Sequence, residues 1–215
     1  TRARKVVQKI TANVSKPYMV HNREYHGSAS IGVVMFRGHQ HPIEELLKQA
    51  DLAMYQAKGA GRNTFCFFDP DMQLTVTARA ALEAHLRVGL QRDELRLHYQ
   101  LQYDIQNRPQ GAEALVRWEH PQRGLVGPSE FITLAEKSGL IIPLGRWVLR
   151  RACEQLAAWA RNPAKPHLTM AVTVHAREFR HPDFIPGLLT PLAHTRAPPR
   201  LLKLELPERL LPEHL

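Results

Sequence analysis

The sequence predicts an α/β protein made of two modules that a helix joins. After Asp93, strand-like and helical segments follow each other in the order strand, strand, helix, helix, strand, helix, strand. Strands separated by helices in this way are typical of a parallel α/β sheet or barrel. Before Pro70 the strands and helices are shorter, and the stretch 73–91 between the two regions contains no Pro. We therefore expect one module on each side of that stretch.

The first module is expected to contain two helices and several short extended segments. Apolar residues from Val6 to Val14 recur at helical spacing, and this helix should end before Pro17. The β-branched run in SASIGVVMF is typical of a buried strand. Gly59 and Gly61 should end the second helix, because Gly tolerates left-handed cap geometry. The expected elements are a helix over 3–15, extended segments over 18–21 and 25–36, a helix over 42–58 and a strand over 63–68.

A long connecting helix is expected after Pro70, because Leu82, Leu86 and Leu90 repeat every four positions. It can be interpreted as a plain scaffold helix or as a signalling element. With a boundary near residue 72, the chain divides into a first module, a linker helix and a second module, at 1–72, 73–92 and 93–215. The strands of the second module are expected at LRLHYQLQY, GAEALVRW, LTMAVTV and LLKLEL, and its main helix at 141–160.

The composition of the chain limits the classes of protein to which it can belong. The 215 residues are 44% hydrophobic and 23% charged, which excludes wholesale disorder. No apolar run reaches the ~18 residues that cross a bilayer, and no secretory signal opens the chain, so no membrane partner is expected for this segment. Cys66 and Cys153 lack metal-ligand spacing and fit buried thiols in a reducing compartment. The chain also starts at Thr1 rather than Met, and together these features are interpreted as those of a cytoplasmic fragment.

The net charge of +9 makes an anion a reasonable partner to consider. The chain has 29 basic and 20 acidic residues, and the basic ones are scattered rather than gathered in one run. This distribution favours a solvated basic surface over a nucleic-acid site, so no nucleic-acid partner is expected.

Two strands of the second module carry residues suited to chemistry. Glu113, Leu115 and Arg117 stand at i, i+2 and i+4, so their side chains leave one face of the strand. A carboxylate and a guanidinium projected together suit an anion or a metal-bound phosphate, although an ion pair between Glu113 and Arg117 would explain them as well. Glu205 lies between two Leu residues in a run expected to be largely buried, where a carboxylate needs a cation, a metal or a proton.

Longer stretches resemble two known families. The segment GAEALVRWEHPQRGLVGPSEFITLAEKSGLIIPLGRWVLRRACEQLAAW resembles the opening of EAL domains, the bacterial cyclic di-GMP phosphodiesterases. Upstream, SASIGVVMF and QADLAMYQAKGAGRN are similar to the closing half of a GGDEF (diguanylate cyclase) domain. The resemblance covers nearly the whole chain in the order usual for tandem GGDEF–EAL proteins. It implies the end of a cyclase-like α/β domain, joined by a helix to the first half of a modified TIM barrel.

The EAL resemblance implies roles for several residues. Glu113 would be a ligand for catalytic Mg²⁺ or Mn²⁺, and Glu205 would be a second metal-binding carboxylate. Arg117 would contact a phosphate of cyclic di-GMP, Leu115 would line the nucleotide groove and Gln100 would touch the substrate. Oxygen ligands of this kind suit hard divalent cations that activate water for hydrolysis. The general-base machinery of the family is expected beyond Leu215, so the catalytic base itself stays unknown.

Three positions depart from the EAL pattern. Thr173 takes the place of a metal-binding Asn, with a shorter hydroxyl. The family's Thr-Glu after the fourth-strand carboxylate is Pro207-Glu208 here, and Pro lacks an amide donor, so the loop at the rim should differ. Leu101 replaces a Pro in the first strand, which is a milder change. His175 follows the third strand, where it could replace a metal ligand, although a loop or capping role is the preferred interpretation.

The GGDEF resemblance implies a vestigial phosphate site. Lys58 and Arg62, four positions apart around a helix end, would contact a GTP triphosphate, and two cations at that spacing can converge on one anion. Capping of the helix C-terminus by basic residues explains the same pair without a ligand. The hairpin that holds GTP in the family is expected upstream of Thr1, so GTP would bind only to a complete GGDEF module.

The resemblance implies a protein of cyclic di-GMP signalling. The parent protein is expected to be a metal-dependent phosphodiesterase that hydrolyses cyclic di-GMP to pGpG, with this chain inactive by itself. The alternative is a degenerate, non-catalytic EAL module that acts as a cyclic di-GMP receptor or a protein-interaction domain. Intact Gln100, Glu113, Arg117 and Glu205 favour the enzyme, whereas Thr173 and Pro207 favour the receptor. Homodimers are usual in the family, but no residue of this chain identifies a dimer face.

Overall fold

The computed structural model describes residues 2–38, 41–165 and 167–207. The chain forms two compact units, residues 1–78 and 79–215. The division falls inside one long helix, α3 (Pro70–Gly89), so the domain boundary expected near residue 72 stays a prediction. No helix in the described ranges is both long and apolar enough to cross a membrane.

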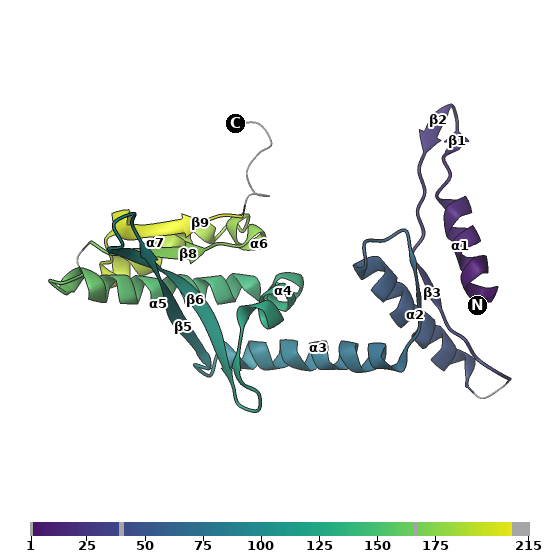
Figure 1. Cartoon of the computed structure of the whole chain (residues 1–215), viewed down its shortest axis with the longest axis horizontal. Helices are drawn as coiled ribbons and strands as arrows, with labels where there is room; N and C mark the ends of the chain where they lie inside the picture. The colour runs from purple at the N-terminus through teal and green to yellow at the C-terminus, as the bar shows by residue number, and fades with distance from the viewer. Residues whose placement is uncertain (1, 39–40, 166, 208–215) are drawn as a thin grey trace. The chain divides into compact units, whose positions relative to one another are not determined.

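The first unit consists of a hairpin, a two-stranded parallel sheet and two helices (Figure 1). Its elements are α1 (Arg2–Val14), β1 (Tyr18–Val20), β2 (Arg23–Tyr25), β3 (Ile31–Val33), α2 (Ile43–Gly59) and β4 (Phe65–Phe67). β1 pairs antiparallel with β2, and β3 pairs parallel with β4. Helix α2 lies very close to β3, because a Cβ on Gly32 would overlap the carbonyl of Ala50.

Most expected elements of the first unit are confirmed, but its central strand is shorter and less buried than expected. β3 covers only Ile31–Val33, and its residues are half-buried. Met35 and Phe36, which the sequence pattern placed in the same buried run, are 65% and 60% exposed. Since β3 pairs only with β4 in a two-stranded sheet, little structure is available to bury the end of this run. Gly61 has the expected positive φ of 107°, just after the end of α2.

The second unit is built on a five-stranded sheet. Its elements after α3 are β5 (Leu95–Tyr103), β6 (Pro109–His120), β7 (Gly124–Val126), α4 (Pro128–Ser138), α5 (Ile141–Arg161), β8 (Thr169–Thr173), α6 (Ala176–Phe179), α7 (Phe184–Thr195), the 3₁₀ turn η1 (Pro199–Leu201) and β9 (Leu202–Glu205). The strand order is β5-β6-β8-β9, with β7 beside β6. The expected order of strands and helices is confirmed.

The pairing of the first two strands differs from the parallel sheet that the sequence predicts. β6, β8 and β9 are parallel, but β5 runs antiparallel to β6. Only residues 104–108 connect β5 to β6, which is enough for a hairpin and too short for a parallel crossover. Asp104 holds this turn, since its Oδ1 accepts the backbone N–H groups of Gln106 at 2.9 Å and Arg108 at 2.8 Å.

Helices cover one face of the sheet, and the hydrophobic core lies between these helices and the sheet. In Figure 1 the long helix α5 runs along the sheet. The fully buried side chains of Trp118, Phe131 and Leu149 bring β6, α4 and α5 together in this core. From α3, Leu86 is fully buried, and Leu82 and Leu90 pack against the same core. The spacing of four residues between these Leu side chains therefore identifies the face of α3 that packs on this core.

A pair of histidines also joins α3 to β6. His85 Nδ1 lies 3.0 Å from His120 Nε2, and His120 is almost completely buried. The backbone N–H of Gln122 donates to His120 Nδ1 at 3.1 Å. His120 therefore carries its proton on Nε2 and donates it to His85. Burial and the neighbouring His85 lower the pKa of His120, which keeps this ring neutral.

Candidate functional site

A row of polar side chains crosses the sheet on the face opposite the core. Gln100 on β5 and Ala171 on β8 are both register partners of Glu113 on β6. Thr173 lies two residues beyond Ala171, and its own partner is Glu205 on β9. Register partners, and residues two apart on one strand, share a face of the sheet. Gln100, Glu113, Thr173 and Glu205 therefore lie on one face across four adjacent strands.

A hydrogen bond joins the middle of this row. The hydroxyl of Thr173 donates to Glu113 Oε1 over 3.1 Å. The backbone pairing of β6 with β8 ends at Glu113 and Ala171, so the side-chain bond extends the contact past the end of the ladder. Thr173 thus holds the Glu113 carboxylate toward β8 and β9.

Glu205 differs from the sequence-based expectation. Its run was expected to be largely buried, but Glu205 is exposed and its neighbours alternate between exposed and half-buried. The reason is the alternation of strand β9, because only every second side chain faces the helices, as Leu202 and Leu204 do. The carboxylate therefore does not need a counter-charge to be stable.

Leu115 and Arg117 continue the same face of β6 beyond Glu113. Both are half-buried. Arg117 Nη1 donates to the backbone carbonyl of Val116 at 2.9 Å. No ion pair between Arg117 and Glu113 occurs among the described residues, so the surface ion pair considered from sequence is not formed. The guanidinium keeps most of its donors for another acceptor.

The oxygen donors of the row suit a hard divalent cation in kind, but they are few. Two carboxylates and one hydroxyl come from β6, β8 and β9. In the described ranges no three His, Cys, Asp or Glu residues stand close enough to hold a metal ion together. The hydroxyl of Thr173 is occupied as a donor to Glu113, which leaves its lone pairs for a cation.

His175 and Pro207 lie next to this row. His175 is the N-cap residue of α6, and its backbone N–H donates to Glu178 Oε2 at 3.4 Å. Its ring Nδ1 lies 3.0 Å from Glu136 Oε1. These contacts confirm the capping role. Pro207 is half-buried, and Glu208 lies outside the described residues.

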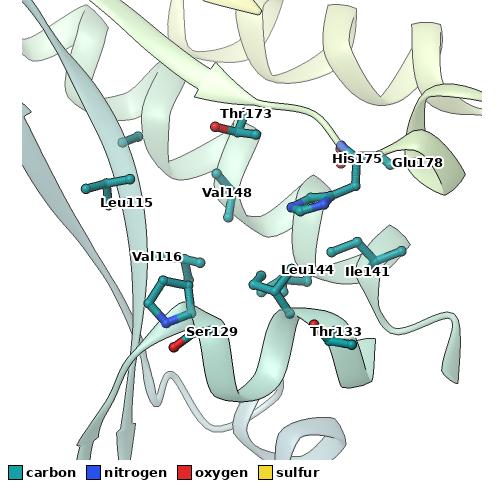
Figure 2. Close-up of a pocket in the computed structure, with 14 residues that line it drawn as sticks. Leu115, Val116, Ser129, Thr133, Ile141, Leu144, Val148, Thr173, His175 and Glu178 are labelled. Carbon is teal, nitrogen blue, oxygen red and sulfur yellow. Dashed lines mark hydrogen bonds between the residues drawn. The ribbon is translucent and has the colours of Figure 1, made fainter. Parts of the chain in front are cut away.

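A pocket of about 330 Å³ opens beside the row (Figure 2). Leu115 and Thr173 line it from the sheet, Ser129 and Thr133 from α4, and Leu144 and Val148 from α5. Glu178 on α6 also lines it, and burial raises the pKa of this carboxyl to about 7. Sequence reasoning missed Glu178. The signal available was its spacing from His175, three positions after a helix N-cap.

In the first unit, the expected phosphate pair does not share a helix face. Lys58 lies in the last turn of α2, which ends at Gly59. Arg62 follows with a left-handed φ of 61°, outside the helix. Both side chains are exposed. The two cations therefore do not share a helix face, and their convergence on one anion stays a prediction.

Comparisons with known proteins assign both regions to families. The family described as "EAL domain" matches residues 83–215, and "Diguanylate cyclase, GGDEF domain" matches residues 1–64. The chain is 39% identical over 204 residues to the bifunctional diguanylate cyclase/cyclic di-GMP phosphodiesterase MucR of Pseudomonas aeruginosa. It is 37% identical over 173 residues to the cyclic di-GMP phosphodiesterase PdeR of Escherichia coli.

The matches cover much of this chain and a smaller part of each relative. The alignment with MucR includes 94% of the chain and 30% of MucR, and that with PdeR includes 80% and 26%. Among solved structures, the PaMucR phosphodiesterase in complex with c-di-GMP is similar with a TM-score of 0.57 and 39% identity. That similarity covers 60% of this chain and 52% of the other.

Proposed function

The chain belongs to the EAL domain family, with a GGDEF region before the EAL region, and on that premise we propose that its second unit binds cyclic di-GMP for metal-dependent hydrolysis to pGpG. The observation that carries this proposal is the row Gln100, Glu113, Thr173 and Glu205 on one face of four adjacent strands. A cytoplasmic location and a homodimer stay predictions from the sequence.

The proposed roles follow from the chemistry of each side chain. Arg117 binds a phosphate of the cyclic dinucleotide, because a guanidinium matches phosphate oxygens and this one has donors to spare. Leu115 packs against the nucleotide, and Gln100 offers an amide beside Glu113. The hydroxyl of Thr173 orients the Glu113 carboxylate.

Glu113 and Glu205, with Thr173 between them, would hold Mg²⁺ or Mn²⁺. When bound, such an ion activates water and stabilises negative charge on the phosphodiester. Support for this proposal comes from two carboxylate groups and one hydroxyl on the adjacent strands β6, β8 and β9, all of them oxygen ligands.

A receptor without turnover is the second candidate function. The observation that favours it is the hydrogen bond from Thr173 to Glu113, because the metal site then offers a short hydroxyl where the family offers an amide. A receptor would use Arg117 and Gln100 in the same way but would release no pGpG.

Titration calorimetry of the 215-residue chain with cyclic di-GMP and Mg²⁺ tests binding. We expect Arg117→Gln to weaken binding about 10–100-fold, the effect of a charge-assisted hydrogen bond worth about 1.5–3 kcal/mol. Arg161→Gln, at the end of α5, is the matched control and should leave the affinity unchanged. No binding by the wild type, or equal binding by Arg117→Gln, contradicts the proposal.

Chromatography of the full-length protein with cyclic di-GMP and Mn²⁺ separates the two candidates. Formation of pGpG that Glu113→Gln abolishes supports the enzyme. Binding without pGpG supports the receptor. In the second case, Thr173→Asn should strengthen Mg²⁺ binding, since a longer amide oxygen reaches further toward the ion.

A GTP site in the first unit would depend on Lys58 and Arg62. Lys58 is an exposed cation in the last turn of α2, and Arg62 is an exposed cation in the turn that follows. We propose GTP as a ligand only for a complete GGDEF module, and a GTP titration of the 215-residue chain should show no binding.

A further inference from the structure

A groove of about 500 Å³ lies on the second unit, between the end of α3 and the first half of α5. Three arginines line it, Arg87 from α3 and Arg146 and Arg150 from α5, and all three are exposed. No Asp or Glu among the described residues lines this groove. It shares no residue with the pocket beside the polar row. The groove is therefore a separate, positively charged surface.

Apolar side chains form most of the remaining lining. Leu90 comes from α3, Leu140 precedes α5, and Pro143 and Trp147 belong to α5. Leu140 and Trp147 are buried, whereas Pro143 is exposed. The guanidinium of Arg151 lies over the Trp147 ring, 5.7 Å from its centre, and adds to the positive charge nearby. The groove thus presents cationic side chains beside an apolar surface.

The three arginines have few acidic partners of their own. Arg146 Nη2 lies 3.0 Å from Asp183 Oδ2, and Arg87 Nη2 lies 3.4 Å from Glu83 Oε1. Both acids lie outside the groove. Arg150 forms no ion pair with any described residue. Because a guanidinium has several N–H donors in a fixed plane, these contacts leave donors for carboxylates of another molecule.

Stability of the helices does not explain the whole arrangement. Arg87 lies in the last turn of α3, where the helix dipole favours a cation. Arg146 and Arg150, in contrast, stand four positions apart on α5, and like charges at this spacing weaken a helix. Arg150 has no compensating ion pair among the described residues. Its position beside the groove indicates a role toward a partner rather than within α5.

The shape of the groove suits a helical segment of a partner. From Pro143 to Arg150 it follows α5 for about 10 Å, at a rise of about 1.5 Å per residue, which is about two helical turns. Acidic residues four apart on a second helix have the same spacing as Arg146 and Arg150. A flat anionic surface would meet the exposed arginines but would leave the apolar lining uncovered.

We propose that this groove is a docking surface for an acidic amphipathic helix of a partner protein. Carboxylates of that helix pair with Arg87, Arg146 and Arg150, and its apolar side chains cover Leu90 and Pro143. Exposed ion pairs add little individually, so the affinity is modest and falls as salt rises. The inference concerns α3 and α5 and stands without the proposed hydrolysis on the sheet.

Fluorescence anisotropy of the 215-residue chain tests the surface with a labelled peptide of about 12 residues, or about three helical turns. The peptide carries glutamates four apart and leucines on the adjoining face. We expect a Kd of about 100 µM or tighter at about 50 mM salt, and binding weakened at least about fivefold at about 300 mM salt. The same peptide with every Glu replaced by Gln should not bind. Absence of binding by the acidic peptide, or equal binding by both peptides, overturns the proposal.

Matched double variants locate the binding. Arg87→Gln with Arg150→Gln removes two charges from the groove and should weaken peptide binding at least about tenfold. Arg161→Gln with Arg200→Gln removes two charges from exposed positions outside it and should leave the Kd unchanged within about twofold. Circular dichroism checks that both proteins are folded. Equal weakening by the two double variants would show a general effect of charge and would overturn the proposal.

Two-dimensional NMR gives a second measurement that needs no variant. The peptide should shift the indole Nε1–H signal of Trp147 more than those of Trp118 and Trp159, since only Trp147 lines the groove. A larger shift at either of the other two would place the peptide elsewhere and contradict the proposal. Binding of phosphatidylserine vesicles in place of the peptide would assign the arginines to a membrane surface, which also overturns it.

Discussion

The two units of the chain bury their apolar residues to very different extents. In the first unit the buried apolar residues are Val7, Ala53 and Ala57, within the described part of the chain. The second unit buries a continuous core that includes Trp118, Phe131 and most of the inward face of α5. The first unit also exposes many large apolar side chains, among them Met19, Met35, Phe36, Ile43 and Leu47.

This difference in burial affects how firmly the candidate residues of each unit are held in position. Glu113 and Thr173 lie on strands whose opposite face packs on a large core, so their positions are fixed. Lys58 and Arg62 lie on a helix end and a turn of the less buried unit. A functional group on a rigid element is placed more accurately than one on a loop.

The largest expected effect comes from the core of the second unit. Trp118 is fully buried, packs edge-on against Phe131 and donates its Nε1–H to Glu94 Oε2 at 3.1 Å. Trp118→Ala should lower the free energy of unfolding by about 3–5 kcal/mol. The half-buried Phe65 of β4 is the matched site in the first unit, and Phe65→Ala should have a smaller effect on the second unit's unfolding.

Tryptophan fluorescence during urea unfolding measures the second unit selectively, because all three Trp residues, at 118, 147 and 159, belong to it. Equal losses of unfolding free energy for Trp118→Ala and Phe65→Ala would show that the two units unfold together. The difference in burial between the units would then not produce a difference in stability.

The next effect depends on pH. Burial raises the pKa of Glu178 to about 7 from its ordinary 4.5, so the folded state holds a proton that the unfolded state releases between these values. Stability should therefore fall by about 3 kcal/mol in total as the pH rises from below 4.5 through 7, and it should level off once the pH is well above 7. Glu178→Gln should remove this loss and be more stable than wild type at pH 8.

Urea unfolding at pH 5 and pH 8 checks this dependence. His175 and Glu136 face the same helix end, and both are unchanged in the variant, so they contribute equally to the two proteins. The same pH slope in wild type and Glu178→Gln would mean that Glu178 is not the group responsible.

A pair of glycine variants sharpens the contrast between a filled and an open position. Gly145→Ala should lose the roughly 1 kcal/mol that Ala normally gains over Gly inside a helix, because its methyl group overlaps the Glu178 carboxyl, which must move. Gly59, at the end of α2, has nothing within 4 Å of a Cβ, so Gly59→Ala should be neutral or slightly stabilising. Thermal unfolding of both proteins measures the difference, and a gain of roughly 1 kcal/mol for Gly145→Ala would contradict the close packing of α5 on α6.

The smallest effect expected is at the polar row. Thr173→Val keeps the shape but removes the hydroxyl that donates to Glu113, which should cost about 0.5–1.5 kcal/mol. Thr75→Val is the control, since Thr75 donates only to the backbone of its own helix α3, at Asp71. A difference of less than 0.5 kcal/mol between the two variants, about the scatter of surface substitutions, would argue against a formed bond in solution.

Local sequence patterns were enough to predict the helices and strands and the faces they bury, but not the direction of every strand. Leu spacing in α3 and the alternation in β5 and β6 identify elements and faces. The antiparallel start of the sheet was missed, although the short 104–108 connection contains the reason for it.

The candidate site could be predicted only in part. The position of Glu113, Leu115 and Arg117 on one face follows from strand alternation, and the structure has this arrangement. The exposure of Glu205 could not be predicted, since alternation says which side a residue faces and not what covers that side. Glu178 was missed because its burial depends on Gly145, more than thirty positions earlier in the chain.

The bond between His85 and His120 has a mechanical consequence. It fastens the last turns of α3 to β6, the strand that carries Glu113, while Leu86 anchors the same turns in apolar contact. Burial lowers the pKa of His120, which disfavours a charged ring at this contact. A displacement of the last turn of α3, around His85 and Leu86, would therefore be felt directly by the strand that carries Glu113.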